Sequence, residues 1–128
     1  MKNEVITEEE LNELSRRVLG AAYIVANTLG CGFKEKVYEN ARCHELRKQG
    51  LDAQKQVAVQ VFYDGVIVGD FICDILVEGI VLLELKAADA IHPEFVAQAL
   101  NYLKATELPL CLILNFGTAR VGIKRVRL

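Results

Sequence analysis

The chain has 128 residues, of which 52% are hydrophobic and 25% are charged, and only two are proline. This length suits one domain with a substantial core, so we expect residues 1–128 to form a single domain. The net charge of −2 excludes a strongly basic coat, although a local basic patch can act within an acidic chain.

The sequence favours a cytoplasmic protein. No stretch reaches the roughly 18 uninterrupted apolar residues of a membrane span, and the charged N-terminus lacks the apolar stretch of a signal peptide. The four cysteines are widely spaced and form no CxxC pair: Cys31, Cys43, Cys73 and Cys111. We therefore expect no membrane association, no disulfide framework and no zinc site.

Two helices are predicted at the start of the chain. Thr7, followed by three glutamates, resembles a capped helix start, and apolar residues recur at helical spacing to about residue 29. A second helix is expected over 34–49, ended by Gly50. Its apolar stripe consists of Val37, Ala41 and His44. The adjoining face, which by periodicity alone is typical of a solvated surface, carries Glu35, Tyr38, Glu39 and Arg42.

A β-hairpin is predicted next, with strands over 56–63 and 66–77. Asp64-Gly65 is a strong signal for a two-residue turn, since both positions tolerate positive φ. A tight turn pairs Tyr63 with Val66 and carries Lys55 to the neighbourhood of Asp74.

A third strand is predicted over about 80–86, after Glu78-Gly79, and the helix over 93–105 and a buried strand over 109–116 follow it. A strand, helix and strand in this order suit a crossover between parallel neighbours. The C-terminal tail alternates basic and apolar residues. It is expected to be an edge strand whose basic face either contacts phosphate or blunts the exposed edge.

Charged residues interrupt two strands that are otherwise apolar. Asp74 breaks the first, and Glu84 and Lys86 break the next. A charged side chain in a sheet that is covered on both faces loses its hydration. Such a residue is rarely present without an ion-pair partner, a bound metal or a functional role. Two acids facing each other beside a lysine are typical of a metal-dependent phosphodiesterase. The alternative is a cross-strand salt bridge in a half-exposed sheet.

The turn at Glu78-Gly79 decides between these alternatives. A two-residue loop would set Asp74 opposite Leu83, with the two acids on opposite faces. A loop one residue longer, with Gly79 in the left-handed region, sets Asp74 opposite Glu84. We predict the longer loop.

Three motifs in this order resemble a known family. Gly32 to Tyr38 matches the GxxExxY motif of a family of small bacterial and archaeal proteins. Asp74 with Glu84-Leu85-Lys86 resembles the signature of the PD-(D/E)XK nuclease superfamily, although Cys73 replaces the proline before the aspartate. Gln98 and Tyr102 resemble the QxxxY motif of its RecB-like branch.

The resemblance implies an α/β fold with a restriction-endonuclease-like core. Helices would flank a mixed sheet of four to five strands, in the order ααβββαβ. It also implies a magnesium or manganese site in which Asp74, Glu84, the Leu85 carbonyl and Glu35 are the ligands. Lys86 would orient or activate the attacking water. Gln98 and Tyr102 would orient Lys86 or the substrate, and we add Tyr38 and Lys55 as candidate substrate contacts.

Three functions compete on the sequence alone. The leading hypothesis is a metal-dependent nuclease that acts on DNA, or with less support on RNA. The alternative is a nuclease-like binding or assembly module whose cleavage is weak or lost. The third is a structural protein, with a protein partner or with a homodimer formed through the apolar first helix.

Overall fold

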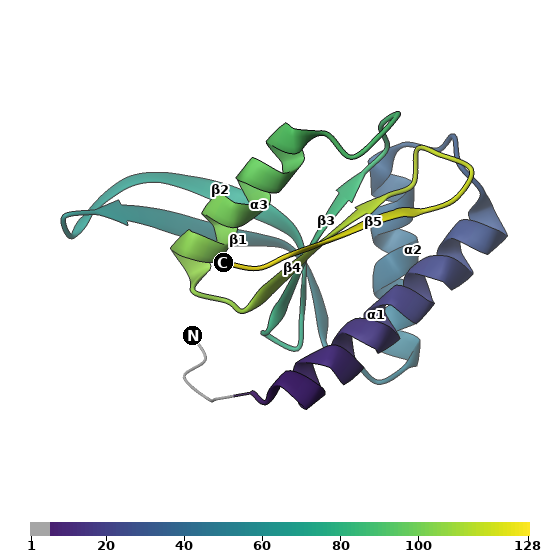
Figure 1. The fold of residues 1–128 in the computed structure, drawn as a ribbon, viewed down its shortest axis with the longest axis horizontal. Coiled ribbons are helices and arrows are strands. Elements are labelled where there is room, and N and C mark those ends of the chain that lie inside the picture. Colours follow the sequence, from purple (N-terminus) through teal and green to yellow (C-terminus); the bar gives the residue numbers. More distant parts are fainter. Residues whose placement is uncertain (1–5) are drawn as a thin grey trace.

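The computed structural model describes residues 6–128, which form three helices and five strands (Figure 1). Every element expected from the sequence is present. The helices and strands in chain order are α1 (Glu8–Leu29), α2 (Glu35–Lys48), β1 (Ala53–Tyr63), β2 (Val66–Val77), β3 (Val81–Lys86), α3 (Pro93–Thr106), β4 (Leu110–Asn115) and β5 (Gly122–Val126).

The strands form one sheet in the order β1-β2-β3-β4-β5. β3 and β4 are parallel and are connected through α3, as predicted, and the other neighbours are antiparallel. Helices α1 and α2 cover one face of the sheet and α3 covers the other (Figure 1). This is an α/β fold with a mixed five-stranded sheet, consistent with a restriction-endonuclease-like core, and the predicted fold class is confirmed.

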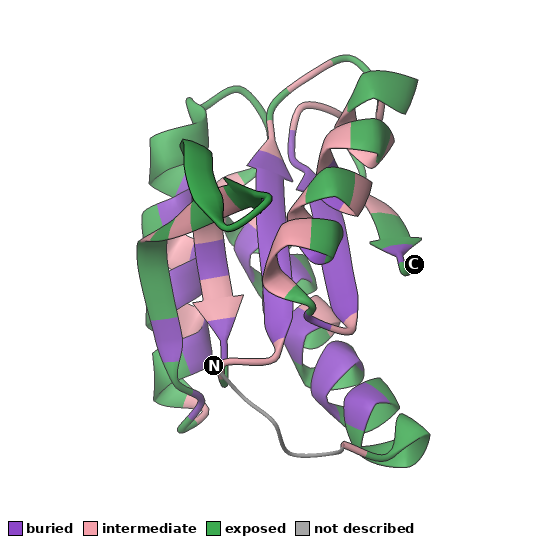
Figure 2. Ribbon diagram, turned by 90° about the vertical axis from the view of Figure 1, so that its left-hand side faces the viewer, coloured by how far each residue is buried: buried purple, intermediate pink, exposed green. Residues whose placement is uncertain are grey.

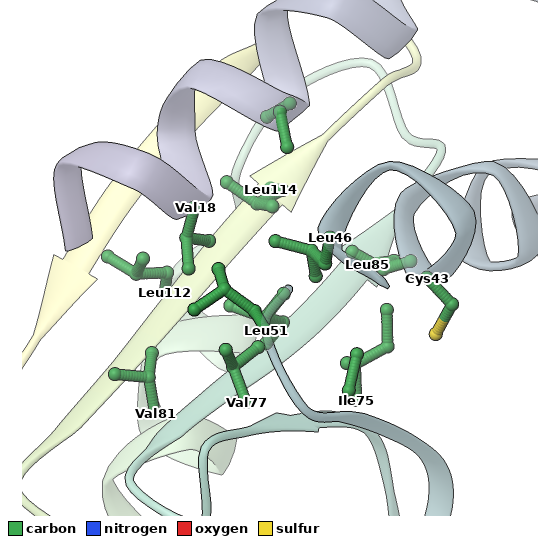
Figure 3. Packing of buried hydrophobic residues seen from close by; sticks show 14 of the residues in the cluster. Val18, Cys43, Leu46, Leu51, Ile75, Val77, Val81, Leu85, Leu112 and Leu114 are labelled. Atoms are coloured by element: carbon green, nitrogen blue, oxygen red, sulfur yellow. The ribbon is translucent and has the colours of Figure 1, made fainter. Parts of the chain in front are cut away.

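The core has two layers, one on each face of the sheet. The larger layer joins α1 and α2 to the sheet, with Val18 and Leu46 packing near Leu112 and Leu114 (Figure 3). The smaller layer lies under α3 and includes Leu103. Because both faces are covered, β3 and β4 are buried along almost their entire length, drawn in purple in Figure 2. This explains why both strands read as nearly continuous apolar runs.

Helix α1 begins with the predicted capping box. The Glu10 N–H donates to the Thr7 hydroxyl at 3.0 Å, and the Thr7 N–H donates to the Glu10 carboxylate at 3.0 Å. Its apolar face is buried against the sheet at Leu11, Leu14, Val18, Ala21, Ala22 and Val25. A homodimer through that face is therefore wrong, because the chain's own core already occupies it. Among residues 6–128, no helix is both long and apolar enough to cross a membrane.

Helix α2 buries a different face from the one predicted. Val37 and His44 are exposed. The buried positions are Tyr38, Glu39, Arg42, Cys43 and Leu46. Charged residues, Glu39 and Arg42, occupy two of these core-facing positions, so hydrophobic periodicity selected the wrong stripe.

Arg42 is the most unusual of these residues, because its side chain is 0% exposed. One guanidinium nitrogen donates to the Val18 carbonyl at 3.0 Å, while Nε and Nη2 have no hydrogen-bond partner. Burial lowers the pKa of Arg42 to about 10. A buried charge with unpaired donors costs free energy, which the surrounding apolar contacts must offset.

Replacing Arg42 with leucine should stabilise the protein by about 1–3 kcal/mol, because the substitution removes this desolvation cost from an apolar site. Urea unfolding followed by circular dichroism measures the change, with Lys48→Leu, which removes an exposed basic residue from the same helix, as the matched control. A less stable Arg42→Leu variant would show that the bond to Val18 outweighs the burial cost.

The β1–β2 hairpin extends beyond the rest of the sheet. Only Ile75 to Val77 of β2 pair with β3, so residues 57–73 form a two-stranded arm (Figure 1). The predicted turn is confirmed, since Tyr63 pairs with Val66 and both turn residues have positive φ.

A register shift between Val61 and Phe62 corrects the predicted pairing along this hairpin. Lys55 pairs with Ile75, and Gln56 takes the place beside Asp74 that was expected for Lys55. The bulge inserts one extra residue into β2, which the sequence pattern did not indicate.

The C-terminal strand β5 is the predicted edge strand, paired only with β4. Two basic side chains reach across to α1, from Arg125 of this strand and from Arg127 just after it. Arg127 forms an ion pair with Glu8 at 2.6 Å, and Arg125 donates to Asn12 at 2.9 Å. These contacts fasten α1 to the edge of the sheet, so half of the predicted basic face is already engaged within the chain.

Candidate active site

The site forms where β2 separates from β3. The ladder between these strands ends with the pair Ile75–Leu83. The same register sets Asp74 opposite Glu84, because the loop contains the extra residue and Gly79 has a φ of 66°. The longer loop predicted from the sequence is therefore confirmed. The structure adds that Glu78 also has positive φ, at 56°.

Both strands of the arm rotate about their own axes at this point, so that the side chains on one face of each strand move to the other side of the sheet. Ile75 packs in the core layer under α1 and α2, whereas Cys73 packs in the layer under α3. Residues two apart in a regular strand share a face, so the chain must rotate at Asp74. On the paired strand, the rotation occurs at Gln56. This residue has a φ of 56°, a left-handed conformation that is uncommon for residues other than glycine.

Two carboxylates occupy the fork that this rotation opens. The Leu85 N–H donates to Asp74 Oδ2 at 2.7 Å, and the Asp74 N–H donates to Glu84 Oε2 at 3.3 Å. Side-chain oxygens thus take the place of the backbone carbonyls that would continue the ladder. The bonds hold the two acids against one another and against the ends of both strands.

The environment of this pair opposes a double negative charge. Glu84 is 4% exposed, and its pKa rises to about 8, first because of burial and then because of the adjacent Asp74. The pKa of Asp74 is also raised, mainly by burial, while its bond from the Leu85 N–H acts in the opposite direction. Over residues 6–128, neither acid lies within salt-bridge distance of a basic side chain. The cross-strand salt bridge considered above is therefore not formed.

Lys86 lies on the α3 side of the sheet, two residues after Glu84. Its ammonium donates to Gln98 Oε1 at 3.2 Å and lies 4.6 Å from the centre of the Phe95 ring. Both contacts come from α3, and they hold the positive charge beside the acids rather than between them. The sequence suggested the Gln98 contact but gave no indication of Phe95.

Helix α2 supplies two further acids to an open cleft at the fork. The cleft has a volume of about 660 Å³, and Glu35, Glu39, Gln56 and Asp74 are among the residues that line it. Glu35 is exposed at the first turn of α2. Glu39 is 5% exposed and accepts from Gln56 Nε2 at 3.0 and 3.1 Å. This pairing ties α2 to the strained position beside Asp74.

The other predicted substrate contacts lie in different surroundings. Tyr38 is 0% exposed, and its hydroxyl donates to the Gly30 carbonyl at 2.6 Å. We correct its predicted role, because a buried tyrosine that holds the α1–α2 loop cannot meet a substrate. Lys55 is exposed and donates to Asn40 at 2.8 Å. Tyr102 is half-buried and stacks on Phe71 with ring centres 4.1 Å apart.

A side chain on β4 fixes the loop that follows Lys86. Asn115 is 1% exposed; it accepts from the Ala88 N–H at 2.9 Å and donates to the Ala88 carbonyl at 3.0 Å. Gly117 lies so close to this loop that a β-carbon would collide with the Ala88 backbone. Sequence reasoning missed the role of both residues. The polar Asn115 at the end of an apolar strand was the available signal.

The two acids are of the chemical type that binds a hard divalent cation. Magnesium and manganese take carboxylate and carbonyl oxygens, and magnesium needs only one or two protein carboxylates. Two adjacent acids with no basic partner, Glu84 buried and Asp74 half-buried, meet that requirement. No cluster of three or more His, Cys, Asp or Glu side chains in residues 6–128 is arranged to bind a metal ion. The site therefore rests on a two-carboxylate core, with Glu35 at the rim of the cleft.

A mixed sheet with helices on both faces, and with paired acids and a lysine where two strands separate, defines a nuclease-like class of α/β protein. The sequence matches the PD-(D/E)XK nuclease superfamily over residues 12–126. Because the match covers nearly the whole chain, this chain belongs to that superfamily.

A solved structure described as "Crystal structure of SSO0001" has a similar fold, with a TM-score of 0.54 and 13% sequence identity. The alignment covers 91% of this chain and 58% of that chain, so this chain spans little more than half of that protein's length. Among curated proteins, none matches this sequence significantly.

Proposed function

We propose that the protein is a magnesium- or manganese-dependent nuclease that hydrolyses phosphodiester bonds in DNA in preference to RNA. Membership of the superfamily suggests nuclease activity. The observation that carries the proposal is the acid pair at the β2–β3 fork, Glu84 buried and Asp74 half-buried, which has no basic partner within residues 6–128 while Lys86 is held alongside. A charge arrangement of this kind is costly unless a cation and a phosphate complete it.

Asp74 and Glu84 would hold the cation, and Glu35 would complete the site from α2. The Leu85 carbonyl is a suitable further ligand. The Leu85 N–H is directed at Asp74, and the N–H and C=O of one strand residue point to the same side. When bound, a divalent cation polarises the phosphate and makes water a better nucleophile at neutral pH.

Lys86 would orient the attacking water and stabilise the negative charge that develops on the phosphate. Gln98 would position Lys86, because its amide oxygen accepts from the ammonium at 3.2 Å and keeps it from closing onto the acids. Tyr102 on the same face of α3, and Lys55 at the base of β1, would contact the substrate beyond the scissile phosphate.

Within the superfamily, we place the chain in the GxxExxY family and the RecB-like branch, on the motifs at Gly32 to Tyr38 and at Gln98 to Tyr102. We propose that residues 1–128 act as one nuclease domain in the cytoplasm of a bacterium.

Cleavage of labelled DNA and RNA in the presence of Mg²⁺, Mn²⁺ or EDTA tests the proposal. We expect DNA cleavage that needs a divalent cation and stops with EDTA. Asp74→Asn, prepared identically, should be inactive and so exclude a contaminating nuclease. Asp70→Asn removes an exposed carboxylate from the same strand and should keep full activity. Cleavage that persists in EDTA, or that both variants retain, would refute the proposal.

The second candidate is a nuclease-fold binding or assembly module without effective cleavage. The lack of a three-residue metal cluster within residues 6–128 favours it, as do the backbone bonds that already engage both acids. Calorimetry with Mg²⁺ and Mn²⁺ separates the two candidates. If neither ion binds to the wild-type protein, the module is the better explanation.

A further inference from the structure

The arm formed by residues 57–73 exposes an unusual amount of apolar surface. Six of its large hydrophobic side chains are between 49% and 74% exposed, and Figure 2 shows its end in green, turned towards the viewer. These side chains are Phe62, Tyr63, Val66, Ile67, Val68 and Ile72. They are six of the eleven large hydrophobic residues that are exposed in the described part of the chain.

The exposed apolar side chains lie on both faces of the arm. Phe62 pairs with Ile67 and Tyr63 with Val66, and the two pairs point to opposite faces because side chains alternate along a strand. With about half of each side chain open to solvent, the six together present on the order of 500–700 Å² of apolar surface, divided between the two faces. The end of the arm is therefore apolar on both sides.

The backbone of the arm is unpaired along both of its edges, because β2 pairs with β3 only from Ile75 to Val77. β1 lies at the edge of the sheet, with β2 as its only neighbour, so every second N–H and C=O group along it points outward. An edge of this kind, with no proline and little charge, tends to pair with another strand. A second copy of β1 that pairs antiparallel about a two-fold axis satisfies these groups. Each residue of one copy then pairs with a residue of the other, and the same two positions pair again on the opposite side of the axis.

The charges on the arm select the kind of partner. Asp64 and Asp70 are the only charged residues between positions 57 and 73, so the arm repels a phosphate backbone. Lys55 lies at the base of the arm and Asp64 at its tip. Antiparallel pairing sets the base of one strand beside the tip of the other. Lys55 of each copy is thereby brought close to Asp64 of the second copy.

We propose that the arm is a dimerisation element, in which β1 of one chain pairs antiparallel with β1 of a second copy and covers Phe62 and Tyr63, the exposed apolar side chains of that strand. The sheet then continues from one molecule into the next. The contact uses Lys55, next to Gln56 at the rim of the cleft, but it does not involve Asp74, Glu84 or Lys86, so dimerisation can be measured separately from cleavage.

Sedimentation velocity over a wide range of protein concentrations tests the proposal. The wild type should form a dimer, and Phe62→Lys should weaken it by at least about tenfold, since it places a charge among the apolar side chains that the second copy covers. Ile24→Lys, at a residue of α1 that is similarly exposed at 48%, is the matched control and should leave the dimer unchanged. Circular dichroism verifies that each variant is folded.

Charge reversal tests the antiparallel arrangement itself. Lys55→Asp and Asp64→Lys should each weaken the dimer, because each sets like charges together. The double variant restores opposite charges and should recover most of the lost affinity. A double variant that is weaker than either single variant would contradict the proposed pairing.

Two other outcomes would overturn the proposal. A wild type that remains monomeric at every concentration would do so, as would a dimer that Phe62→Lys does not affect. Binding of a labelled oligonucleotide in EDTA provides the remaining comparison. If Phe62→Lys abolishes oligonucleotide binding while the wild type is a monomer, the arm recognises nucleic acid instead.

Discussion

Substituting methionine for Lys86 is expected to reduce metal-dependent cleavage by about 100- to 10,000-fold, while binding of the divalent cation is retained. Methionine keeps the length of the side chain and its packing beside the Phe95 ring, but it removes the ammonium that lies 4.6 Å from that ring. The reaction then loses the charge beside the phosphate without loss of the carboxylates. Single-turnover cleavage measures the chemical step, and calorimetry measures the cation.

The matched control for this variant is Lys104→Met, which removes an exposed lysine from the same helix that holds Lys86. It should cleave at nearly the wild-type rate. Equal rates for wild type and Lys86→Met would mean that the cleavage arises at another site or in another protein. If Lys86→Met also loses cation binding, the lysine instead maintains the structure of the cation site.

Replacing Glu84 with glutamine is expected to stabilise the metal-free protein by a few kcal/mol above about pH 8, and to abolish its response to magnesium. Glutamine resembles the protonated acid, and its amide oxygen can still accept from the Asp74 N–H. The wild type must instead ionise a buried carboxyl beside a second acid. This substitution would therefore gain stability and lose function together.

The pH dependence has a definite direction. The Glu84 carboxyl titrates near pH 4.5 when unfolded, and its pKa is raised to about 8 in the folded chain. The folded state thus holds the proton more tightly, so its contribution to stability is complete below pH 4.5 and is lost as the pH rises to about 8. If the proposed function is correct, magnesium binds the ionised acids and should restore stability most strongly at the alkaline end.

Urea unfolding in EDTA and in Mg²⁺, at several pH values, measures both effects. The wild-type and Glu84→Gln curves should coincide in acid and separate as the pH rises. If the variant is less stable than the wild type at every pH, the carboxyl is ionised and well solvated in the folded chain. That result would remove the main support for a cation site at the fork.

Much of the fold could be predicted because local signals agreed with tertiary packing. The capping box at Thr7, the turn at Asp64-Gly65 and the extra residue after Glu78 each depend on a few neighbouring residues. The apolar runs of β3 and β4 required cover on both faces, which the helices provide. The acids could be found by the same argument, since a charged residue within a buried apolar strand indicates a binding partner or a functional role.

Helix α2 shows where periodicity fails. Its core-facing positions include Glu39 and Arg42, which any hydrophobic pattern assigns to solvent. Each is retained by a contact with a distant part of the chain: Gln56 for the glutamate and the Val18 carbonyl for the arginine. Such contacts join residues more than 15 positions apart, and no short-range pattern contains them.

The sequence by itself determined the elements of this protein, their order, and the two acids and the lysine that interrupt its apolar strands. Only the tertiary structure decided how those residues meet. The bulge in β2 brought Gln56 rather than Lys55 beside Asp74, and the rotation of both strands at that point opened the fork. Periodicity records which residues avoid water, whereas register and strand rotation depend on pairing between segments that fold against each other.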